Sequence, residues 1–182
     1  MKTCTPFFGQ KTLIVGGVNT GKTSYTQLLL LKCRGQKIII VLDMAPEVFK
    51  GVGGKMHVPT EPDIHYFTTH IRPPRLMGKD EQESMKIASE NAAIIERDLF
   101  SKVDSIPADT LIINDVSLYL QAGNPKLLIH VLEKFPTIIM NGYLGHSFPE
   151  GPLTQREREN MKILMEFCDQ VIQAEELSQV NE

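Results

Sequence analysis

The sequence predicts an α/β fold, with a mostly parallel sheet of five or six strands in a three-layer α/β/α arrangement. The first observation is the alternation of short apolar runs with longer segments of helical periodicity. The second is that the apolar runs are uninterrupted, as in strands buried on both faces of a sheet. The third is the length of 182 residues, which suits one compact domain, so we expect a single domain over residues 1–182.

The expected strands are short runs rich in Val, Ile and Leu. They are Thr12–Val15, Lys37–Leu42, Ile64–Phe67, Thr110–Asn114, Thr137–Met140 and Gln170–Gln173. Asp43, Asp115 and Asn141 each follow a strand or its last apolar residue. These three side chains are therefore expected at the carboxyl edge of the sheet, where ligands bind in such folds.

Segments with helical periodicity connect the strands. A helix is expected from about Lys22 to Arg34, with a packed face of Tyr25, Leu28, Leu29 and Lys32. Others are expected from Asp80 to Val103 and from Pro125 onward. In the last helix, Thr154 and Glu157 have the spacing of a capping box at its start.

Two segments interrupt this pattern. Met44–Asp63 is rich in proline and glycine and is predicted to be a long mobile loop, either a lid or plain surface irregularity. The next segment carries a basic cluster that either grips phosphate groups or is simply solvated. This cluster consists of His70, Arg72, Arg75 and Lys79. Arg156 and Arg158 oppose the dipole of the last helix, which indicates a function or, alternatively, solvation.

Composition excludes several classes of protein. Hydrophobic residues make up 42% and charged residues 23%, which argues against a disordered or fibrous chain. The net charge of −3 gives no reason to expect binding to nucleic acid or to an anionic membrane. No long apolar segment indicates export or membrane insertion. Cys4, Cys33 and Cys168 form no C-x-x-C pair, which favours neither a zinc site nor a disulfide framework and predicts free, buried thiols in a cytoplasmic setting.

One stretch, LIVGGVNTGKTS at residues 13–24, has residue types and a spacing that indicate a specific binding function. It matches G-x-x-x-x-G-K-[ST] between an expected strand and an expected helix. The glycines allow successive amides to point inward as an anion site, and the helix adds its positive dipole end. We expect a nucleoside triphosphate to bind there. The expected binding residues are Gly16, Gly17, Val18, Asn19, Thr20, Gly21, Lys22, Thr23 and Ser24.

The expected catalytic residues are Lys22, Asp43 and Asp115. Lys22 would bridge the β- and γ-phosphates, and Thr23 would offer its hydroxyl to Mg²⁺. Asp115 ends the apolar LIIND segment and would hold the same ion, directly or through water; the alternative is ordinary turn chemistry. Asp43 would act as a general base or substrate anchor, with the same alternative. Asn141 would sense the γ-phosphate or serve as a buried capping amide.

GGVNTGKT, together with the Asp115 strand, resembles the P-loop NTPases, of RecA-like or kinase-like type. DTLIINDVSLYL and NGYLGHSFPEGPL are similar to segments of the adenosylcobinamide kinase/guanylyltransferase enzymes. That resemblance implies ATP- or GTP-dependent transfer to a corrinoid precursor, with His70 as the nearest candidate to carry a nucleotidyl group. The ATP:corrinoid adenosyltransferases are similar in element order and size, but they usually have an acid where this chain has Val116.

Val116 in place of an acid points away from vigorous hydrolysis, since many hydrolytic P-loop ATPases carry a water-activating acid there. We therefore expect an ATP-dependent kinase or nucleotidyltransferase that uses Mg²⁺ and acts on a small-molecule acceptor, with GTP as an alternative nucleotide. The competing hypothesis is an ATPase or switch that works with a protein partner. Homo-oligomer formation is left open.

Overall fold

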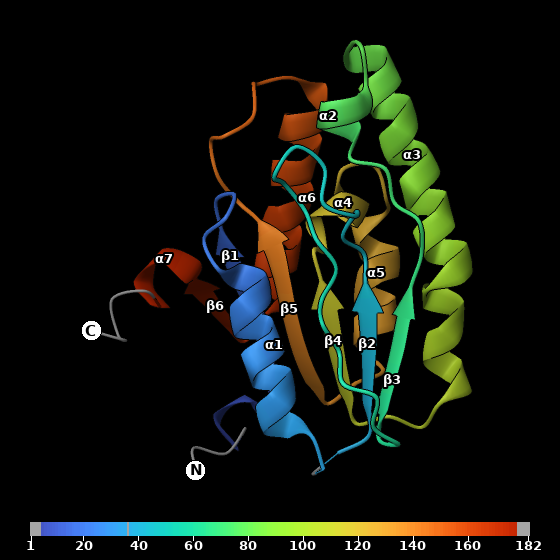
Figure 1. The fold of residues 1–182 in the computed structure, drawn as a ribbon, viewed down its shortest axis with the longest axis vertical. Helices are drawn as coiled ribbons and strands as arrows, with labels where there is room; N and C mark the ends of the chain where they lie inside the picture. The colour runs from blue at the N-terminus through green and yellow to red at the C-terminus, as the bar shows by residue number, and fades with distance from the viewer. Residues whose placement is uncertain (1–4, 36, 178–182) are drawn as a thin grey trace.

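A six-stranded sheet forms the centre of the computed structural model, which describes residues 5–35 and 37–177 (Figure 1). The strands are β1 (Lys11–Gly16), β2 (Ile39–Asp43), β3 (Ile64–Thr68), β4 (Thr110–Asn114), β5 (Thr137–Tyr143) and β6 (Gln170–Gln173). They are all parallel, in the order β3-β2-β4-β5-β1-β6. The predicted α/β fold is confirmed, and the sheet has the larger of the two expected sizes.

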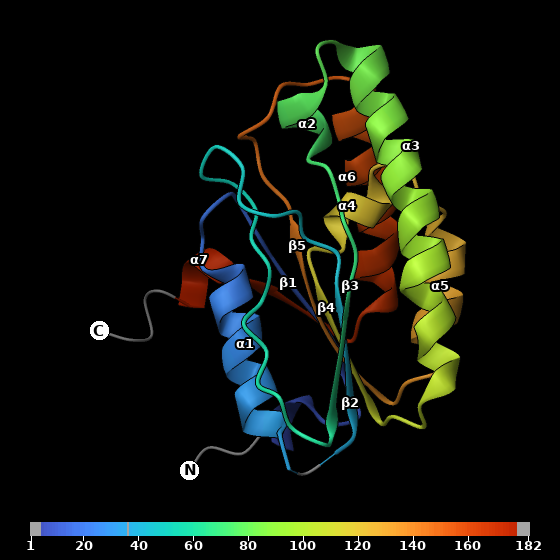
Figure 2. The same ribbon diagram turned by 45° about the vertical axis from the view of Figure 1, so that its right-hand side comes forward.

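Helices cover both faces of this sheet, so the molecule has three layers (Figure 2). The helices are α1 (Lys22–Cys33), α2 (Pro74–Met77), α3 (Glu81–Asp98), α4 (Ser117–Leu120), α5 (Pro125–Leu132), α6 (Pro152–Phe167) and α7 (Ala174–Leu177), with 3₁₀ turns at Thr5–Phe7 and Phe100–Ser105. α1 lies on one face, and α3, α5 and α6 lie on the other with α4. α2 lies beyond the carboxyl edge of the strands, beside the loops that follow them.

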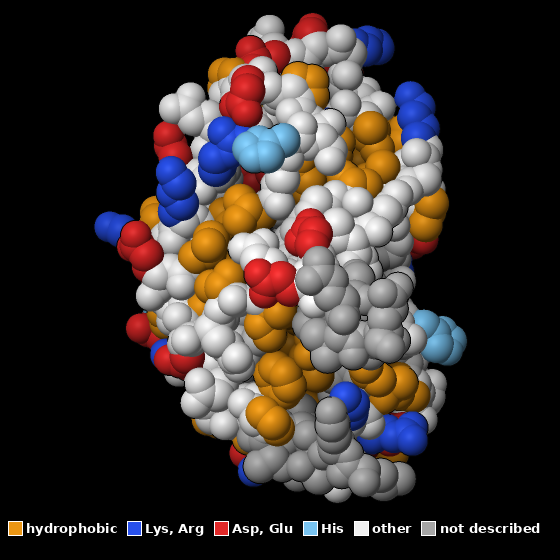
Figure 3. Space-filling view, turned by 90° about the vertical axis from the view of Figure 1, so that its left-hand side faces the viewer, with side chains coloured by type: hydrophobic (Ala, Val, Ile, Leu, Met, Phe, Trp, Pro, Cys, Tyr) orange, Lys and Arg blue, Asp and Glu red, His pale blue; other side chains and the backbone are white. Residues whose placement is uncertain are grey.

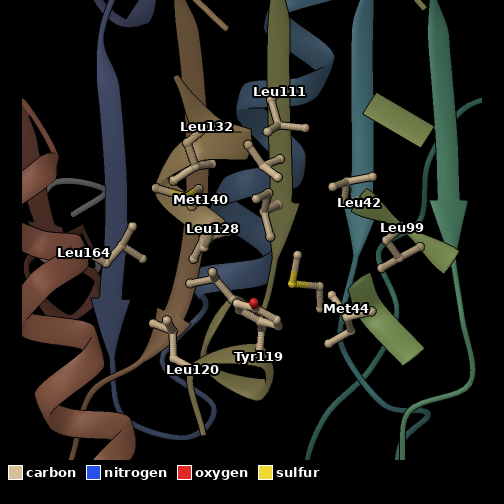
Figure 4. Close-up of a cluster of buried hydrophobic side chains, with 14 of the residues drawn as sticks. Leu42, Met44, Leu99, Leu111, Tyr119, Leu120, Leu128, Leu132, Met140 and Leu164 are labelled. Carbon is tan, nitrogen blue, oxygen red and sulfur yellow. The ribbon is translucent and has the colours of Figure 1, made fainter. Parts of the chain in front are cut away.

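Alternating side chains of the strands build two separate cores. Leu42, Leu111 and Met140 point to the face covered by α3 to α6, where they pack with Tyr119 and Leu128 (Figure 4). The neighbouring residues on the same strands point to the α1 face and pack against that helix. Burial on both faces explains why the strand sequences are uninterrupted apolar runs.

The packed face of α1 differs from the expected one. Its buried residues are Thr26, Leu29, Leu30 and Cys33, whereas Leu28 is 44% exposed. Thr26 is buried because its hydroxyl accepts a hydrogen bond from Asn141 of β5, at 2.9 Å. This contact beneath the loop that precedes α1 turns the buried stripe away from Leu28.

The capping box expected in the last helix is wrong. α6 begins at Pro152 with Gly151 as its N-cap, so Thr154 lies inside the first turn. Both Thr154 and Glu157 instead bind the side chain of Arg75. A long-range ion pair therefore uses the residues whose local spacing suggested a cap.

Residues 44–63 contain no helix or strand apart from one bridge between Phe49 and Val52. The segment crosses the same face of the sheet as α1 (Figure 1). Met56 is 4% exposed and packs in the α1-side core, and its backbone N–H donates to Asp43 at 2.6 Å. The segment thus packs on this face of the sheet and is not plain surface irregularity.

Acidic and basic side chains are mixed on the face of the molecule that carries α7 and β6, and separate hydrophobic patches lie among them (Figure 3). Among the described helices, none has the length and apolar character needed to cross a bilayer.

Cys168 is free, but Cys33 is disulfide-bonded, so the prediction of a free thiol at Cys33 is wrong. The prediction of a cytoplasmic setting loses the support it drew from free cysteines.

Candidate functional site

The loop between β1 and α1 turns through two left-handed residues. Asn19 and Gly21 adopt left-handed conformations, with φ of 58° and 83°, and Gly21 is the N-cap of α1. Left-handed residues between right-handed ones turn successive N–H groups toward a common centre. Glycine takes this conformation at no cost, and asparagine is among the other residues that tolerate it. Of the glycines in this loop, Gly21 therefore has a left-handed conformation, whereas Gly16 and Gly17 do not.

Lys22 folds back over this loop. Its Nζ donates to the backbone oxygen of Gly17 and, at 3.4 Å, to Oγ1 of Thr20. Burial lowers the pKa of Lys22, and the charges of Asp115 and Glu175 oppose that shift. The ammonium group is thus held at the loop by backbone and carboxylate charges, where a phosphate can replace its present partners.

The end of α7 also contacts the loop. Oε1 of Glu175 accepts a hydrogen bond from the backbone N–H of Gly17 at 3.0 Å, and this bond lowers the pKa of the Glu175 carboxyl. Local sequence gives no signal for this contact, because it joins residues from opposite ends of the chain. The carboxylate shows that an N–H of this loop binds an anionic oxygen.

Polar residues of β2, β4 and β5 form one hydrogen-bonded network behind the loop, although Asn141, expected just after its strand, lies within β5. Asn114 is its centre: its Oδ1 accepts from Thr23 Oγ1 at 3.1 Å and from Asn141 Nδ2 at 3.0 Å. Its Nδ2 donates to Asp43 Oδ1 at 2.9 Å. The expected meeting of Thr23, Asp43 and Asn141 therefore occurs, but through Asn114. Sequence reasoning missed this residue, although a polar side chain at the end of an apolar strand was a usable signal.

Asp43 is fully buried and surrounded by donors. Besides Asn114, its carboxylate accepts from the backbone N–H groups of Ala45, at 3.1 Å, and Met56, and from the Tyr66 hydroxyl at 3.0 Å. Burial, together with the charge and hydrogen bond of Asp43, raises the pKa of Tyr66. A carboxylate with this many donors anchors the chain after β2, and it does not line the cavity described below.

Asp115 has a different environment. It follows β4 with a left-handed φ of 57°, accepts a hydrogen bond from the Ser117 hydroxyl, and donates its N–H to Asn141 Oδ1 at 3.0 Å. Burial raises the pKa of Asp115 to about 6, against the opposing effects of the Ser117 bond and the Lys22 charge. Asp115 is therefore a carboxylate that titrates near neutral pH at the edge of a cavity.

A cavity of about 380 Å³ joins these groups. One end is formed by residues 18–24 of the loop with Asp115 and Asn141. The other end is formed by α2, α4, the end of β5 and α6, and it is lined by Pro73, Pro74, Arg75, Leu76, Leu118, Gln121, Tyr143, Phe148 and Glu157. We call these the loop end and the far end. Gly16 and Gly17 shape the loop but do not line the cavity.

Most of the predicted basic cluster lies outside this cavity. His70 is exposed and is not among the lining residues, and Arg72 pairs with Glu90. Arg158 pairs with Glu150, and Arg156 donates to the backbone oxygen of Ala122 at 2.8 Å. Arg75 is the member of the cluster that reaches the far end.

The loop end fits Mg²⁺ in the manner typical of nucleotide sites. The described residues contain no group of three or more His, Cys, Asp or Glu side chains that could hold a metal by themselves. Mg²⁺ with a nucleotide needs one or two protein oxygens, because phosphates and waters fill its other positions. The Thr23 hydroxyl and the Asp115 carboxylate both line the loop end and are oxygen donors of this kind.

Comparison with known proteins assigns no family. No family model matches the chain, and no curated protein matches it. A solved structure from Pyrococcus horikoshii OT3 matches with a TM-score of 0.44 and 12% identity, over 95% of this chain and 88% of the other. A Pif1 helicase, solved in a study of unwinding at forked double-stranded DNA, matches with a TM-score of 0.34 and 16% identity, over 91% of this chain and 40% of the helicase chain. Neither similarity bears on function, and the corrinoid families receive no support.

Proposed function

We propose that this protein binds a Mg²⁺–nucleoside triphosphate, in the first instance ATP, at residues 16–24 and transfers a phosphoryl group to a small acceptor. The loop supports the nucleotide part of this proposal. Its left-handed turns orient N–H groups inward, α1 contributes the positive end of its dipole, and Lys22 lies over the loop. These are the features that bind polyphosphate in P-loop proteins.

The observation that carries the transfer is the continuity of the cavity. The cavity lined by the loop residues extends to the far end, which is built by α2, α4, α6 and the end of β5. A hydrolase needs room only for water beyond the terminal phosphate. A chamber lined by prolines and aromatic rings suits a second, organic reactant.

Asp115 takes the base role that the sequence suggested for Asp43. Of the described residues that line the loop end, Asp115 is the one with a carboxylate, whereas Asp43 is saturated by donors. In the transfer, an acceptor oxygen bonds to the γ-phosphorus as the bond to the β–γ bridging oxygen breaks. The acceptor proton passes to Asp115, ADP leaves, and Lys22 stabilises the charge on the transferring group.

When bound, Mg²⁺ would neutralise charge on the phosphates. Thr23 would hold the ion through its hydroxyl, and Asp115 would bind one of its waters. Asn114 positions Thr23 through their hydrogen bond. Asp115→Asn separates the two roles of Asp115, because loss of the base lowers the rate at every Mg²⁺ concentration, whereas loss of a metal contact raises the Mg²⁺ concentration required.

An ATPase or switch is the second candidate, and one observation favours it. The LIIND pattern suggested Asp115 as the metal-binding acid, but the side chain that contacts Thr23 is that of Asn114, and Asp115 lies one residue beyond it. A carboxylate at this next position can orient a water molecule for hydrolysis. The absence of an acid at Val116 therefore does not argue against hydrolysis once the structure is considered.

Product analysis tests the choice between these functions. The protein is incubated with Mg²⁺–ATP or Mg²⁺–GTP, with and without a pool of small metabolites, and ADP, pyrophosphate and phosphate are followed. Formation of ADP without phosphate, dependent on the metabolites, supports phosphoryl transfer. Pyrophosphate release would indicate nucleotidyl transfer instead. Phosphate release that only a protein partner stimulates would contradict both.

A further inference from the structure

The surroundings of Asn114 allow its amide one orientation. Nδ2 lies 2.9 Å from Oδ1 of Asp43 and 3.3 Å from the backbone oxygen of Gly54. A backbone oxygen accepts hydrogen bonds and cannot donate them, and the same holds for an ionised carboxylate, so both neighbours require a donor. The opposite orientation would place the amide oxygen of Asn114 against two other oxygens. Asn114 therefore turns its Oδ1 away from Asp43.

Asn141 fixes the same orientation independently. Its Oδ1 accepts from the backbone N–H of Asp115 at 3.0 Å, and its Nδ2 donates to Thr26 Oγ1 at 2.9 Å. The proton of the Thr26 hydroxyl is directed at the backbone oxygen of Lys22, at 2.9 Å, so Thr26 presents a lone pair to Asn141. Nδ2 of Asn141 also donates to Asn114 Oδ1 at 3.0 Å. The network on the β5 side thus requires an acceptor from Asn114.

Asp43 is the fixed end of the network on the β2 side. Oδ1 of its carboxylate accepts from Asn114 and from the N–H of Ala45, and Oδ2 accepts from the N–H of Met56 and from the Tyr66 hydroxyl. Asp43 and Asn114 are both fully buried, so water does not compete for these bonds. Because each carboxylate oxygen already accepts from two donors, Asp43 holds the Asn114 amide in place.

The orientation of Asn114 determines where the proton of the Thr23 hydroxyl points. Oγ1 of Thr23 lies 3.1 Å from Oδ1 of Asn114, which only accepts, so Thr23 must donate in this bond. A hydroxyl has one proton and two lone pairs. With its proton directed at Asn114, Thr23 has only lone pairs left for a ligand in the cavity that it lines.

A hydroxyl in this state distinguishes a cation from a phosphate oxygen. Phosphate oxygens are acceptors, so a lone pair of Thr23 repels them, whereas a hard cation binds to it. If the amide of Asn114 had the opposite orientation, Thr23 could accept from it and donate its own proton to a phosphate. The direction of one buried amide therefore decides which of the two ligands Thr23 can bind.

We infer that Asn114, held by Asp43, is a positioning residue that acts through Thr23: it presents the Thr23 hydroxyl as a cation ligand and prevents it from donating to phosphate. Asn114 itself does not line the cavity. This inference rests on the proposed function, because it concerns the nucleotide site. It adds that the site takes the Mg²⁺ complex of the nucleotide in preference to the metal-free triphosphate.

The metal preference of nucleotide binding tests the inference. A non-hydrolysable ATP analogue is titrated calorimetrically in Mg²⁺ and in EDTA, and the ratio of the two Kd values is compared between proteins. Wild type is expected to bind at least about tenfold more weakly in EDTA. Asn114→Ala frees the Thr23 hydroxyl to donate to phosphate, so we expect a ratio at least about threefold smaller. An unchanged ratio in this variant overturns the inference.

A double-mutant cycle shows whether Asn114 acts through Thr23. In a Thr23→Val background, Asn114→Ala should leave the Kd ratio unchanged, because the hydroxyl that it controls is gone. The same effect in both backgrounds overturns the inference.

Asn91→Ala is the matched control. Asn91 is also a buried amide and is bonded through both amide atoms to the backbone of Arg72, but it does not line the cavity. The variant should lose stability and keep the wild-type ratio. A change as large as that of Asn114→Ala would show that the ratio reports general loosening of the fold, and it would also overturn the inference.

Neutron diffraction from deuterium-exchanged crystals of the nucleotide-free protein locates the hydroxyl proton directly, and it decides the inference even if Asn114→Ala does not fold. The Thr23 deuteron should point at Asn114 Oδ1, and the deuterons of the Asn114 amide at Asp43 and Gly54. A Thr23 deuteron directed into the cavity, or the opposite amide orientation, overturns the inference.

These outcomes separate the inference from the proposed function. Nucleotide binding with the same metal preference in wild type and Asn114→Ala overturns the inference and leaves nucleotide binding standing. If wild type binds no nucleotide in either Mg²⁺ or EDTA, the proposed function fails, and the neutron structure still decides how Asn114 orients Thr23.

Discussion

Asp43 and Asp115 both lie at the end of an apolar run in the sequence, but their carboxylates have different surroundings in the structure. Asp43 receives hydrogen bonds from two backbone N–H groups, a tyrosine hydroxyl and an asparagine amide. Asp115 receives one from Ser117; it is only half-buried, and burial raises its pKa to about 6. Such different environments suit a structural role for Asp43 and the base role proposed for Asp115.

Asp115→Asn is expected to stabilise the protein at pH 7. The folded pKa of about 6 lies above the ordinary value of 3.8, so the folded state binds more protons than the unfolded state between these pH values. The stability that Asp115 contributes is therefore complete below 3.8 and is lost as the pH rises through about 6. We expect a gain of roughly 1–3 kcal/mol in unfolding free energy at pH 7 and a smaller gain at pH 4. Urea unfolding at both pH values measures this, and a variant less stable than wild type at pH 7 contradicts it.

Turnover should follow the protonation of the same carboxylate. If Asp115 takes the acceptor proton, the rate of nucleotide consumption falls as the pH drops through about 6 and is level above it. Asp115→Asn should lower the rate by about 10²- to 10⁴-fold and remove this pH dependence. A wild-type profile that stays flat between pH 5 and 7.5 would exclude Asp115 as the base.

Asp43→Ala is expected to destabilise the fold instead of changing only the chemistry. It removes a fully buried carboxylate and leaves its four donors without an acceptor, at a cost of about 3–5 kcal/mol. Asp104→Ala is the control, since Asp104 pairs with Lys134 at the surface, where a pair contributes about 1 kcal/mol or less. Chemical denaturation of the two variants measures the difference. Equal stability in both would show that Asp43 is not an anchor.

At the scale of elements, the strands were predictable and the short helices were not. The four inner strands, β1, β2, β4 and β5, carry continuous apolar runs because the sheet is covered on both sides. Thr110–Asn114 and Gln170–Gln173 match their predicted bounds. α2 and α4 have four residues each, which is too short for a helical period to show. Because these two helices build much of the far end of the cavity, the far end could not be predicted from the sequence.

The loop end of the candidate site was predictable because its residues are contiguous and match a phosphate-binding motif in the sequence. Gly21, Lys22 and Thr23 lie where the motif requires. The far end depends instead on contacts across the chain, such as that of Arg75 with Glu157. Local patterns cannot reveal such a pair, and the spacing of Thr154 and Glu157 even suggested a cap in its place.

Met56→Ala tests whether residues 44–63 are part of the folded core. Met56 is almost fully buried between the sheet and α1, so its truncation should cost about 2–5 kcal/mol. Val48→Ala in the same segment is the control, because Val48 is 66% exposed and its truncation should change stability by about 0.5 kcal/mol or less. Thermal unfolding of both variants gives the comparison. If the segment were mobile, Met56→Ala would not lower the stability of the protein.

The topology of the whole molecule explains how distant residues meet. All six strands are parallel, so the loop after β1, the Asp43 and Asp115 positions and Asn141 share one edge of the sheet. β5 lies between β1 and β4, and Asn141 of β5 makes hydrogen bonds with Asn114 and Asp115 at the end of β4 and with Thr26 of α1. The order of strands thus brings Asp43, Asn114 and Asn141 together in one hydrogen-bonded network beneath the loop between β1 and α1.

Isothermal titration of wild-type protein and Lys22→Ala with a non-hydrolysable ATP analogue and Mg²⁺ tests nucleotide binding most directly. Wild type should bind with a micromolar Kd, and Lys22→Ala should bind at least about 100-fold more weakly, since it loses a charge-assisted contact to phosphate. The variant should keep the wild-type circular dichroism spectrum. No binding to wild type, or equal affinity for the two proteins, would contradict the proposal that this loop holds a triphosphate.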